Sequence, residues 1–224
     1  MRFGVIRFPG SCDETDAVLA CERVPGSSAT LLWHGDKDLH DVEAVVVPGG
    51  FSYGDYLRVG AIARFSPVME SVISFAREGG LVLGICNGFQ VLCEAGLLPG
   101  ALLPNVGLRF VCRQVNVEVQ RASMPFMGDC APGERLSIPV KHTTGRYYAP
   151  PEDLERLEAH GQILLRYAFD GNPNGSSNDI AGVSNEEGNV FGLMPHPEHA
   201  VDPLTGSDDG LKLFAAAAKA AAPA

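Results

Sequence analysis

Short, almost wholly apolar segments alternate with helical patterns in the first half of the chain, and this alternation constrains the fold more than any other feature. Residues 42–47 and Leu81–Ile85 are apolar nearly throughout, as in strands that are buried on both faces. Between them, Pro67–Arg77 has the apolar spacing of a helix. Strands that alternate with helices form parallel sheets covered on both sides. We therefore expect an α/β fold with a doubly wound, mostly parallel sheet.

The remaining segments extend this pattern. A first helix is expected to begin at Ser11 or Asp13, either of which can act as its N-cap. The longer, partly alternating segments 106–119 and 135–140 predict a β section inserted later in the chain. Further strands are expected at residues 3–8, 29–33, 163–169, 180–183 and 190–194, and further helices at 87–95 and 208–222. A chain of 224 residues with no repeat or linker predicts a single domain, residues 1–224.

The charge and the cysteine pattern exclude several classes of function. A net charge of −10 disfavours both nucleic acid and anionic membranes as partners. The N-terminal segment lacks the apolar region of a signal peptide, and no apolar run is long enough to span a membrane. The six cysteines include no CxxC pair, so we expect reduced thiols, no metal site and a cytoplasmic location.

The sequence G-I-C-N-G-F-Q at residues 84–90 places a cysteine where a buried strand runs directly into a helix. This is the arrangement of a nucleophile elbow, with Cys86 in place of serine. The turn is so sharp that the residues two positions away, Gly84 and Gly88, must be small. The positive end of the helix dipole favours a thiolate at this position. The N–H of Asn87 is placed to bind an oxyanion. Cys86 is therefore the predicted nucleophile, although a buried structural cysteine is the common alternative.

A nucleophilic thiol needs a base, and the base needs an orienting group. His196 and Glu198 lie in the sequence M-P-H-P-E, directly after a predicted strand. Pro197 disfavours a helical conformation at His196, and residues i and i+2 of an extended segment project to the same side. Glu198 can therefore hold the imidazole of His196. Ligands of open α/β sheets bind at such strand ends. Alone, this motif would equally fit a loop histidine beside a solvated glutamate.

The glycines of the sequence P-G-G at residues 48–50 are the third element of the predicted site. Gly49 and Gly50 allow the backbone to approach a ligand closely and can supply a second N–H to an oxyanion hole. An ordinary turn is the alternative. We expect structural roles for the other cysteines and histidines: Cys12, Cys21, Cys93, Cys112, Cys130, His34, His40, His160 and His199.

Taken together, the order P-G-G, then G-x-C-x-G-x-Q, then H-P-E resembles the triad (class I) glutamine amidotransferases. More narrowly, the chain is similar to the glutaminase subunits of phosphoribosylformylglycinamidine synthase, which acts in purine biosynthesis. This resemblance rests on the sequence runs 7–11, 48–58, 84–90, 172–176 and 192–200 and covers essentially the whole chain. It implies a flavodoxin-like class I glutamine amidotransferase fold.

The resemblance also implies a role for each motif residue. Cys86 would attack the side-chain amide of glutamine, His196 would transfer the proton, and Glu198 would hold His196. The amides of Gly50 and Asn87 would form the oxyanion hole, with Gly49 beside them. Gln90 and His142 would bind the glutamine. Residues 51–58 would face the synthase partner or shape the glutamine pocket.

The sequence departs from the family pattern in two places. After Gly10 the family usually has Ser-Asn-Cys-Asp, whereas this chain has Ser11-Cys12-Asp13 and is one residue shorter. Around His142 the family usually has Ala-His-Gly-Glu-Gly, whereas residues 141–145 here are K-H-T-T-G. Neither departure touches Cys86, His196 or Glu198.

Replacing the oxygen of an amide with nitrogen requires activation by ATP. The chain, however, has no G-x-x-x-x-G-K-[ST] loop for binding the phosphates of a nucleotide. We therefore expect no cofactor in this chain, with ATP and Mg on a large synthase subunit, and a small bridging subunit in the same complex. Three alternatives remain: a glutaminase for another synthase, a non-catalytic cysteine sensor on a flavodoxin-like fold, and a self-standing peptidase or gamma-glutamyl hydrolase.

Overall fold

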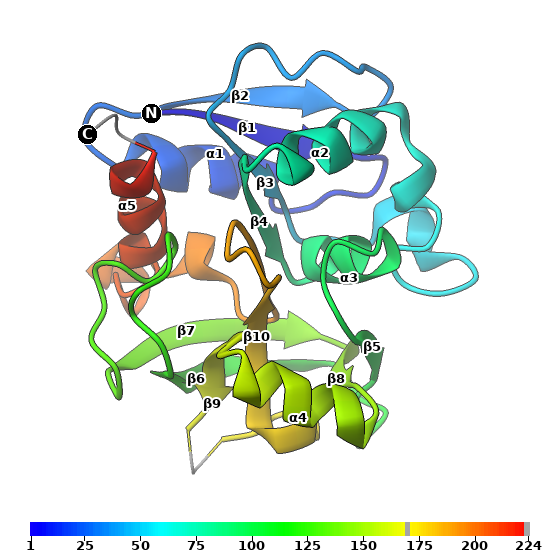
Figure 1. Ribbon diagram of the computed structural model, residues 1–224, viewed down its shortest axis with the longest axis vertical. Coiled ribbons are helices and arrows are strands. Elements are labelled where there is room, and N and C mark those ends of the chain that lie inside the picture. Colours follow the sequence, from blue (N-terminus) through cyan, green and yellow to red (C-terminus); the bar gives the residue numbers. More distant parts are fainter. Residues whose placement is uncertain (169–170, 222–224) are drawn as a thin grey trace.

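The computed structural model describes residues 1–168 and 171–221 (Figure 1). Within these residues nine strands form one sheet, in the order β2-β1-β3-β4-β11-β10-β9-β6-β7. The first five in this order are mutually parallel: β2 (Ser28–Trp33), β1 (Arg2–Arg7), β3 (Ala44–Val47), β4 (Leu81–Ile85) and β11 (Val190–Leu193). The remaining four are antiparallel: β10 (Ile180–Ser184), β9 (Ile163–Tyr167), β6 (Val111–Val119) and β7 (Arg135–His142). The predicted α/β fold is confirmed, with the inserted β section continuing the same sheet.

Helices cover the parallel half of the sheet. Helix α1 (Glu14–Glu22) packs on β1 and β2 and contacts α5 (Leu211–Ala220), whereas α2 (Pro67–Arg77) and α3 (Asn87–Glu94) pack on β4 (Figure 1). Every residue of β3, β4 and β11 is buried, so both faces of the sheet are covered there. The hydrophobic core is continuous from Phe3 on β1 to Ala217 on α5, which supports the expectation of one domain. Among the described residues, none of the helices has the length and apolar character needed to cross a membrane.

The structure corrects some predicted boundaries and adds three elements. The strand expected at 106–119 begins only at Val111, because the preceding residues form a turn in which Leu108 has a φ of 50°. Helix α4 (Pro151–Ala159) was not predicted, because its sequence is mostly charged and only Leu157 is buried. Strands β5 (Ala101–Pro104) and β8 (Thr144–Tyr148), which form a separate two-stranded sheet, were also missed. The predicted element ends at Phe169 and Ala222 lie outside the described residues.

Candidate active site

Cys86 lies at the join between β4 and α3, where the sequence predicted the elbow. Its φ and ψ are 50° and −103°, a strained conformation for a residue other than glycine. Its N–H donates to the carbonyl oxygen of Leu193 at 2.8 Å, which ties the elbow to the end of the neighbouring strand β11. The residue is only 5% exposed. The strain fixes the thiol at the carboxyl edge of the sheet, where it faces the loops that follow other strands.

The two glycines of the elbow are required by close backbone packing. A Cβ at Gly88 would overlap the carbonyl oxygen of Val47 and lie 2.6 Å from its carbonyl carbon. A Cβ at Gly84 would lie 2.9 Å from the backbone of Gly88. Helix α3 therefore starts against the end of β3, which brings the P-G-G turn beside Cys86.

His196 follows β11, the strand next to β4, and its N–H donates to the carbonyl oxygen of Pro139 at 2.8 Å. Its Nδ1 lies 2.6 Å from Oε1 of Glu198, and both side chains are buried. The backbone of His196 is non-helical, as predicted, but Glu198 lies in a 3-10 turn, Pro197–His199, rather than in an extended segment. Proline favours the first position of a helical turn, so Pro197 starts the turn that returns Glu198 to the imidazole.

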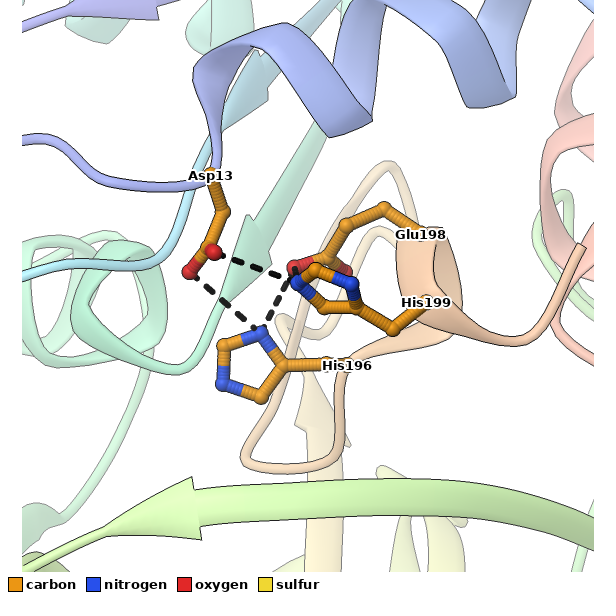
Figure 2. Close-up of side chains that lie close together, drawn as sticks. All are labelled: Asp13, His196, Glu198 and His199. Atoms are coloured by element: carbon orange, nitrogen blue, oxygen red, sulfur yellow. Dashed lines mark hydrogen bonds and ion pairs between the residues drawn. The ribbon is translucent and has the colours of Figure 1, made fainter. Parts of the chain in front are cut away.

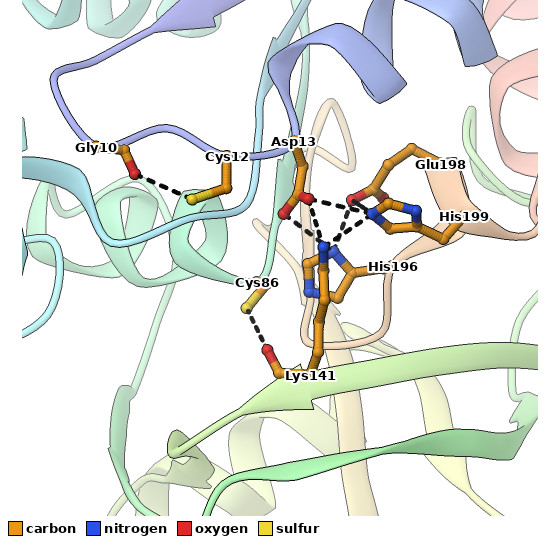
Figure 3. Close-up of polar contacts among 8 residues, drawn as sticks. All are labelled: Gly10, Cys12, Asp13, Cys86, Lys141, His196, Glu198 and His199. Carbon is orange, nitrogen blue, oxygen red and sulfur yellow. Dashed lines mark hydrogen bonds and ion pairs between the residues drawn. The ribbon is translucent and has the colours of Figure 1, made fainter.

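The charges around His196 favour its protonated form. Burial lowers the pKa of this imidazole, but the carboxylate of Glu198 and the sulfur of Cys86 outweigh burial and raise the pKa to about 10. Figure 3 shows Cys86 and His196 on facing segments of the site. Because Nδ1 is engaged by Glu198, Nε2 is the nitrogen that can exchange a proton with the thiol. The arrangement suits an ion pair of thiolate and imidazolium.

Cys86 opens into a cavity of about 240 Å³. The cavity is lined by Gly50, Phe51, Asp55, Val59, Cys86, Gln90, Phe110, Lys141, His142, Thr143 and Thr144. These residues come from the segment 50–59 after β3, the elbow and helix α3, the loop before β6, and the point where β7 runs into β8. A larger cavity of about 640 Å³, bounded by Arg77, Arg156 and Asn189 among others, contains none of the predicted site residues. Of these two cavities, the smaller one is therefore the candidate active site.

Two backbone N–H groups beside the cavity have no backbone acceptor among the hydrogen bonds of the described residues, as the predicted oxyanion hole requires. Gly50 pairs with Ser11 in an isolated β-bridge whose two hydrogen bonds come from the N–H groups of Phe51 and Cys12, so neither uses that of Gly50. Asn87 is the first residue of α3, where a backbone N–H has no partner within the helix. Both residues lie directly beside Cys86 or its cavity.

Gly49 has a more specific role than flexibility. A Cβ at this position would overlap Oδ2 of Asp13 and lie 2.7 Å from Cε1 of His196. The glycine therefore leaves room for a carboxylate and the predicted base to face each other across the backbone.

Gln90 and Asn87 form one buried network beside the cavity. The Nδ2 of Asn87 donates to Oε1 of Gln90 at 2.8 Å and to Oδ1 of Asp55 at 3.2 Å. The Nε2 of Gln90 donates to the carbonyl oxygen of Thr144. Gln90 thus connects the elbow helix to the start of β8, and its binding of glutamine stays a prediction.

His142 lines the cavity, but both of its ring nitrogens have partners. Nδ1 lies 3.1 Å from Oδ1 of Asn105, and Nε2 lies 3.4 Å from Nδ2 of Asn174. Burial, with the charge of His196, lowers the pKa of His142 to about 4, so the ring is neutral at pH 7. In the neutral tautomer that fits these partners, Nδ1 donates to Oδ1 of Asn105 and Nε2 accepts from Nδ2 of Asn174. These contacts give His142 a structural part, and its contact with substrate stays a prediction.

Sequence reasoning missed three charged or polar residues of the site: Asp13, Lys141 and His199 (Figures 2 and 3). Asp13 occupies the N-cap position of α1, as expected, but its side chain makes no capping hydrogen bond. Its Oδ1 instead accepts from Nζ of Lys141 and lies 3.1 Å from Nε2 of His199. The second histidine in the run H-P-E-H was a signal for His199, but no local pattern marks Lys141.

Asp13, His196, Glu198 and His199 each place one possible metal-ligand atom within 4.8 Å of the others. The ammonium of Lys141 lies among them, bound to Asp13 and 2.9 Å from Nε2 of His199. The ammonium of Lys141 thus already contacts Asp13 and His199, two of the four groups that a metal ion would need.

The fold and this cysteine-centred site are those expected of a glutamine amidotransferase. The sequence model of the family described as "CobB/CobQ-like glutamine amidotransferase domain" matches residues 1–218. The chain therefore belongs to the glutamine amidotransferases. A glutamine amidotransferase structure from Thermotoga maritima has the same fold, with a TM-score of 0.63 at 16% identity over 100% of this chain and 99% of that one.

Two comparisons narrow the family. The phosphoribosylformylglycinamidine synthase subunit PurQ of Rubrobacter xylanophilus is 61% identical over 214 residues, which cover 96% of each chain. A chain of the structure of PurLQS from Thermotoga maritima is 43% identical, with a TM-score of 0.89 over 97% of both chains. Within its class, the chain belongs to the family of PurQ subunits.

Proposed function

We propose that this chain hydrolyses glutamine to glutamate and ammonia and supplies the ammonia to a phosphoribosylformylglycinamidine synthase. The observation that carries this proposal is the convergence of three strand ends. The elbow after β4 holds Cys86, the loop after β11 holds His196 with Glu198 at 2.6 Å, and the turn after β3 brings Gly50 to the same cavity. Family membership supports the choice of glutamine as substrate.

The reaction then follows from the geometry. The thiolate of Cys86 attacks the side-chain amide carbon, and the oxyanion that forms accepts hydrogen bonds from the N–H groups of Gly50 and Asn87. The imidazolium of His196 gives its Nε2 proton to the departing nitrogen, which leaves as ammonia. In the second half, neutral His196 removes a proton from water, and the hydroxide attacks the glutamyl thioester to release glutamate. Glu198 holds the imidazole throughout.

The ammonia is used by a partner. The solved relative from Thermotoga maritima is part of a PurLQS structure. By analogy, this chain would assemble with a large synthase subunit, which binds ATP and Mg and makes formylglycinamidine ribonucleotide, and with a small bridging subunit. Phe51 and Phe110 line the cavity yet are 54% and 61% exposed, and Leu57, in the segment that follows Phe51, is 91% exposed. Such apolar exposure around an active-site mouth suits a docked partner. We also propose a cytoplasmic location, in keeping with six free thiols.

Ammonium rescue tests the division of labour. In the assembled complex, Cys86→Ala should abolish glutamine-dependent synthesis but leave synthesis from ammonium chloride, because the acceptor chemistry lies on another chain. Rescue should strengthen as the pH approaches ~9, since free NH₃ is the nucleophile. The readout is formylglycinamidine product per minute. Cys130→Ala, at a cysteine of similar burial whose neighbours lie outside the site, is the matched control. If ammonium supports the wild type but not the Cys86 variant in an intact complex, the proposal is wrong.

A second measurement separates a subunit from a self-standing hydrolase. We expect the isolated chain to hydrolyse glutamine poorly and the synthase partner to activate it. Steady-state glutamate production with and without the partner decides the matter. Full activity of the isolated chain would favour the self-standing alternative.

A further inference from the structure

His196 faces two carboxylates rather than one. Oε1 of Glu198 lies 2.6 Å from its Nδ1, and Oδ2 of Asp13 lies 3.6 Å from the same nitrogen (Figure 2). Asp13 and Glu198 are each 3% exposed. The two acids come from opposite ends of the chain, so the second carboxylate is not part of the H-P-E motif.

The backbone around Asp13 is built to bring it there. The N–H groups of Cys12 and Asp13 donate to the carbonyl oxygen of Gly49 at 3.1 and 3.4 Å. The missing side chain of Gly49 leaves the space in which Oδ2 of Asp13 approaches His196. Because the side chain of Asp13 makes no capping bond to α1, its contacts are all with the site.

Two buried carboxylates beside one imidazole need compensating positive charge. Lys141, on β7, supplies it through its ion pair with Oδ1 of Asp13. Burial acts to raise the pKa of Asp13, but His199, His196 and Lys141 together hold it well below the usual range, so this carboxyl stays ionised. Burial acts to lower the pKa of Lys141, but Asp13 raises it above its ordinary value, which keeps the ammonium charged. The pair is therefore permanent over the working pH range.

His199 completes the arrangement. Its Nε2 lies 2.9 Å from Nζ of Lys141 and 3.1 Å from Oδ1 of Asp13. One ring nitrogen either accepts or donates a single hydrogen bond, so Nε2 bonds one of these groups at a time. The titratable groups that face Asp13 are thus Lys141 from β7 and His196, Glu198 and His199 from the turn after β11, with Cys12 and Glu14 beside it in sequence.

We propose that Asp13 is a positioning residue for glutamine hydrolysis, a second carboxylate that stabilises the imidazolium of His196 together with Glu198, and that Lys141 holds Asp13 in place. The proposal rests on the proposed function for its kinetic consequences. It requires that Asp13 provide part of the stabilisation of the imidazolium charge in the wild type. When Glu198 is neutralised, Asp13 must provide most of that stabilisation. Removal of Asp13 must then weaken the ion pair between Cys86 and His196.

The main test is a double-mutant cycle with Asp13→Asn and Glu198→Gln in the assembled complex. Asp13→Asn keeps the shape of the side chain and should lower kcat about tenfold while leaving KM nearly unchanged. The same change in the Glu198→Gln background should cost a further ~100-fold, because groups that share one partner couple strongly. Asp16→Asn, which removes the same charge one helical turn away, is the matched control and should leave kcat unchanged. The proposal would be overturned if Asp13→Asn lowered kcat by the same factor in both backgrounds. It would also be overturned if Asp16→Asn lowered kcat as much as Asp13→Asn does.

A second readout does not depend on glutamine as substrate. The alkylation of Cys86 by iodoacetamide reports the thiolate, which the imidazolium stabilises. Asp13→Asn should shift the pH midpoint of this alkylation upward, because a weaker imidazolium leaves the thiolate less stabilised. An unchanged midpoint overturns the proposal, even if the chain proves not to be a glutaminase. If Asp13→Asn does not fold, Lys141→Met should give the same upward shift and Lys141→Arg should restore the wild-type midpoint. Equal midpoints for these two variants would also overturn it.

Discussion

Nδ1 of His196 and Oε1 of Glu198 lie 2.6 Å apart within a chain segment of three residues. A 3-10 turn that starts at Pro197 brings them together, and the side chains are 1% and 0% exposed. The short, desolvated contact fixes the tautomer and the orientation of the imidazole and leaves Nε2, which has no hydrogen-bond partner among the described residues, as the nitrogen available to Cys86.

The first prediction follows from this contact. Glu198→Gln should reduce glutamine turnover by an intermediate factor, on the order of 10⁴-fold or less, because an orienting carboxylate acts only through the imidazole. Cys86→Ala should approach complete inactivation, because no covalent intermediate can form. Steady-state turnover by the assembled complex measures both. Losses of equal size would give Glu198 a direct part in proton transfer.

The second prediction concerns cysteine reactivity. A limiting amount of a glutamine-mimicking electrophile should label Cys86 before the other five cysteines, because the reagent binds beside Cys86 and His196 favours the thiolate. Burial raises the pKa of Cys21 and Cys93, and burial with Glu134 nearby raises that of Cys130 to about 11. Peptide mapping after labelling identifies the site.

The exposed cysteines are the internal control for this labelling. Cys12 and Cys112 are both exposed, so reagents can reach both, although burial and the charge of Asp13 raise the pKa of the Cys12 thiol. A simple alkylating agent should label them readily, whereas the glutamine mimic should not. Dominant labelling of Cys93 or Cys112 by the glutamine mimic would contradict the assignment of Cys86.

The third prediction concerns the elbow glycine. Gly88→Ala should lower the free energy of unfolding by about 3 kcal/mol or more, since the new Cβ overlaps the buried backbone of Val47 and cannot be relieved by a rotamer change. Gly107→Ala is the matched control, because a Cβ there meets nothing within 4 Å. Urea unfolding of both variants gives the comparison, and a Gly88 variant as stable as the control would refute the packing argument.

The fourth prediction concerns acid stability and His142. The pKa of this buried ring is lowered to about 4 from an ordinary value of 6.5, so between these values the unfolded chain binds a proton that the folded chain does not. Stability should therefore fall as the pH drops from 6.5 to 4, with a contribution on the order of 3 kcal/mol from this group. His196 does not oppose this trend, because its raised pKa keeps it protonated in both states below pH 6.5.

Urea unfolding of wild type and His142→Asn at pH 6.5 and pH 4.5 isolates the contribution. The wild type should lose more stability between the two pH values than the variant, which has no titrating ring. Both proteins share the same carboxylates, so the effect of their titration cancels when the stability loss of the variant is subtracted from that of the wild type. Identical losses would show that His142 is not held neutral by burial.

Local patterns in the sequence determined the buried strands, the cysteine elbow and the pairing of His196 with Glu198. The apolar runs at β3 and β4 identified a sheet buried on both faces, and glycines at 84 and 88 identified the elbow. The H-P-E run identified a histidine and its acid because the two are only two residues apart, although they meet in a 3-10 turn and not in the extended segment that was expected. These predictions needed only backbone sterics and short sequence separations. By contrast, α4 carried too weak an apolar pattern, with one buried leucine, for its helix to be predicted.

Only the tertiary structure decided how these pieces meet. Asp13 is separated by 128 residues from Lys141 and by 186 from His199, and no local pattern links them. They meet because the segment after β11 packs against β7, where the N–H of His196 donates to the carbonyl oxygen of Pro139, although β11 and β7 are not neighbours in the sheet. The same long-range packing engages both ring nitrogens of His142 and joins Gln90 to the start of β8. A side chain's hydrogen-bond partners depend on which distant segments fold against it. A short sequence motif contains no information about those segments, so it cannot predict these contacts.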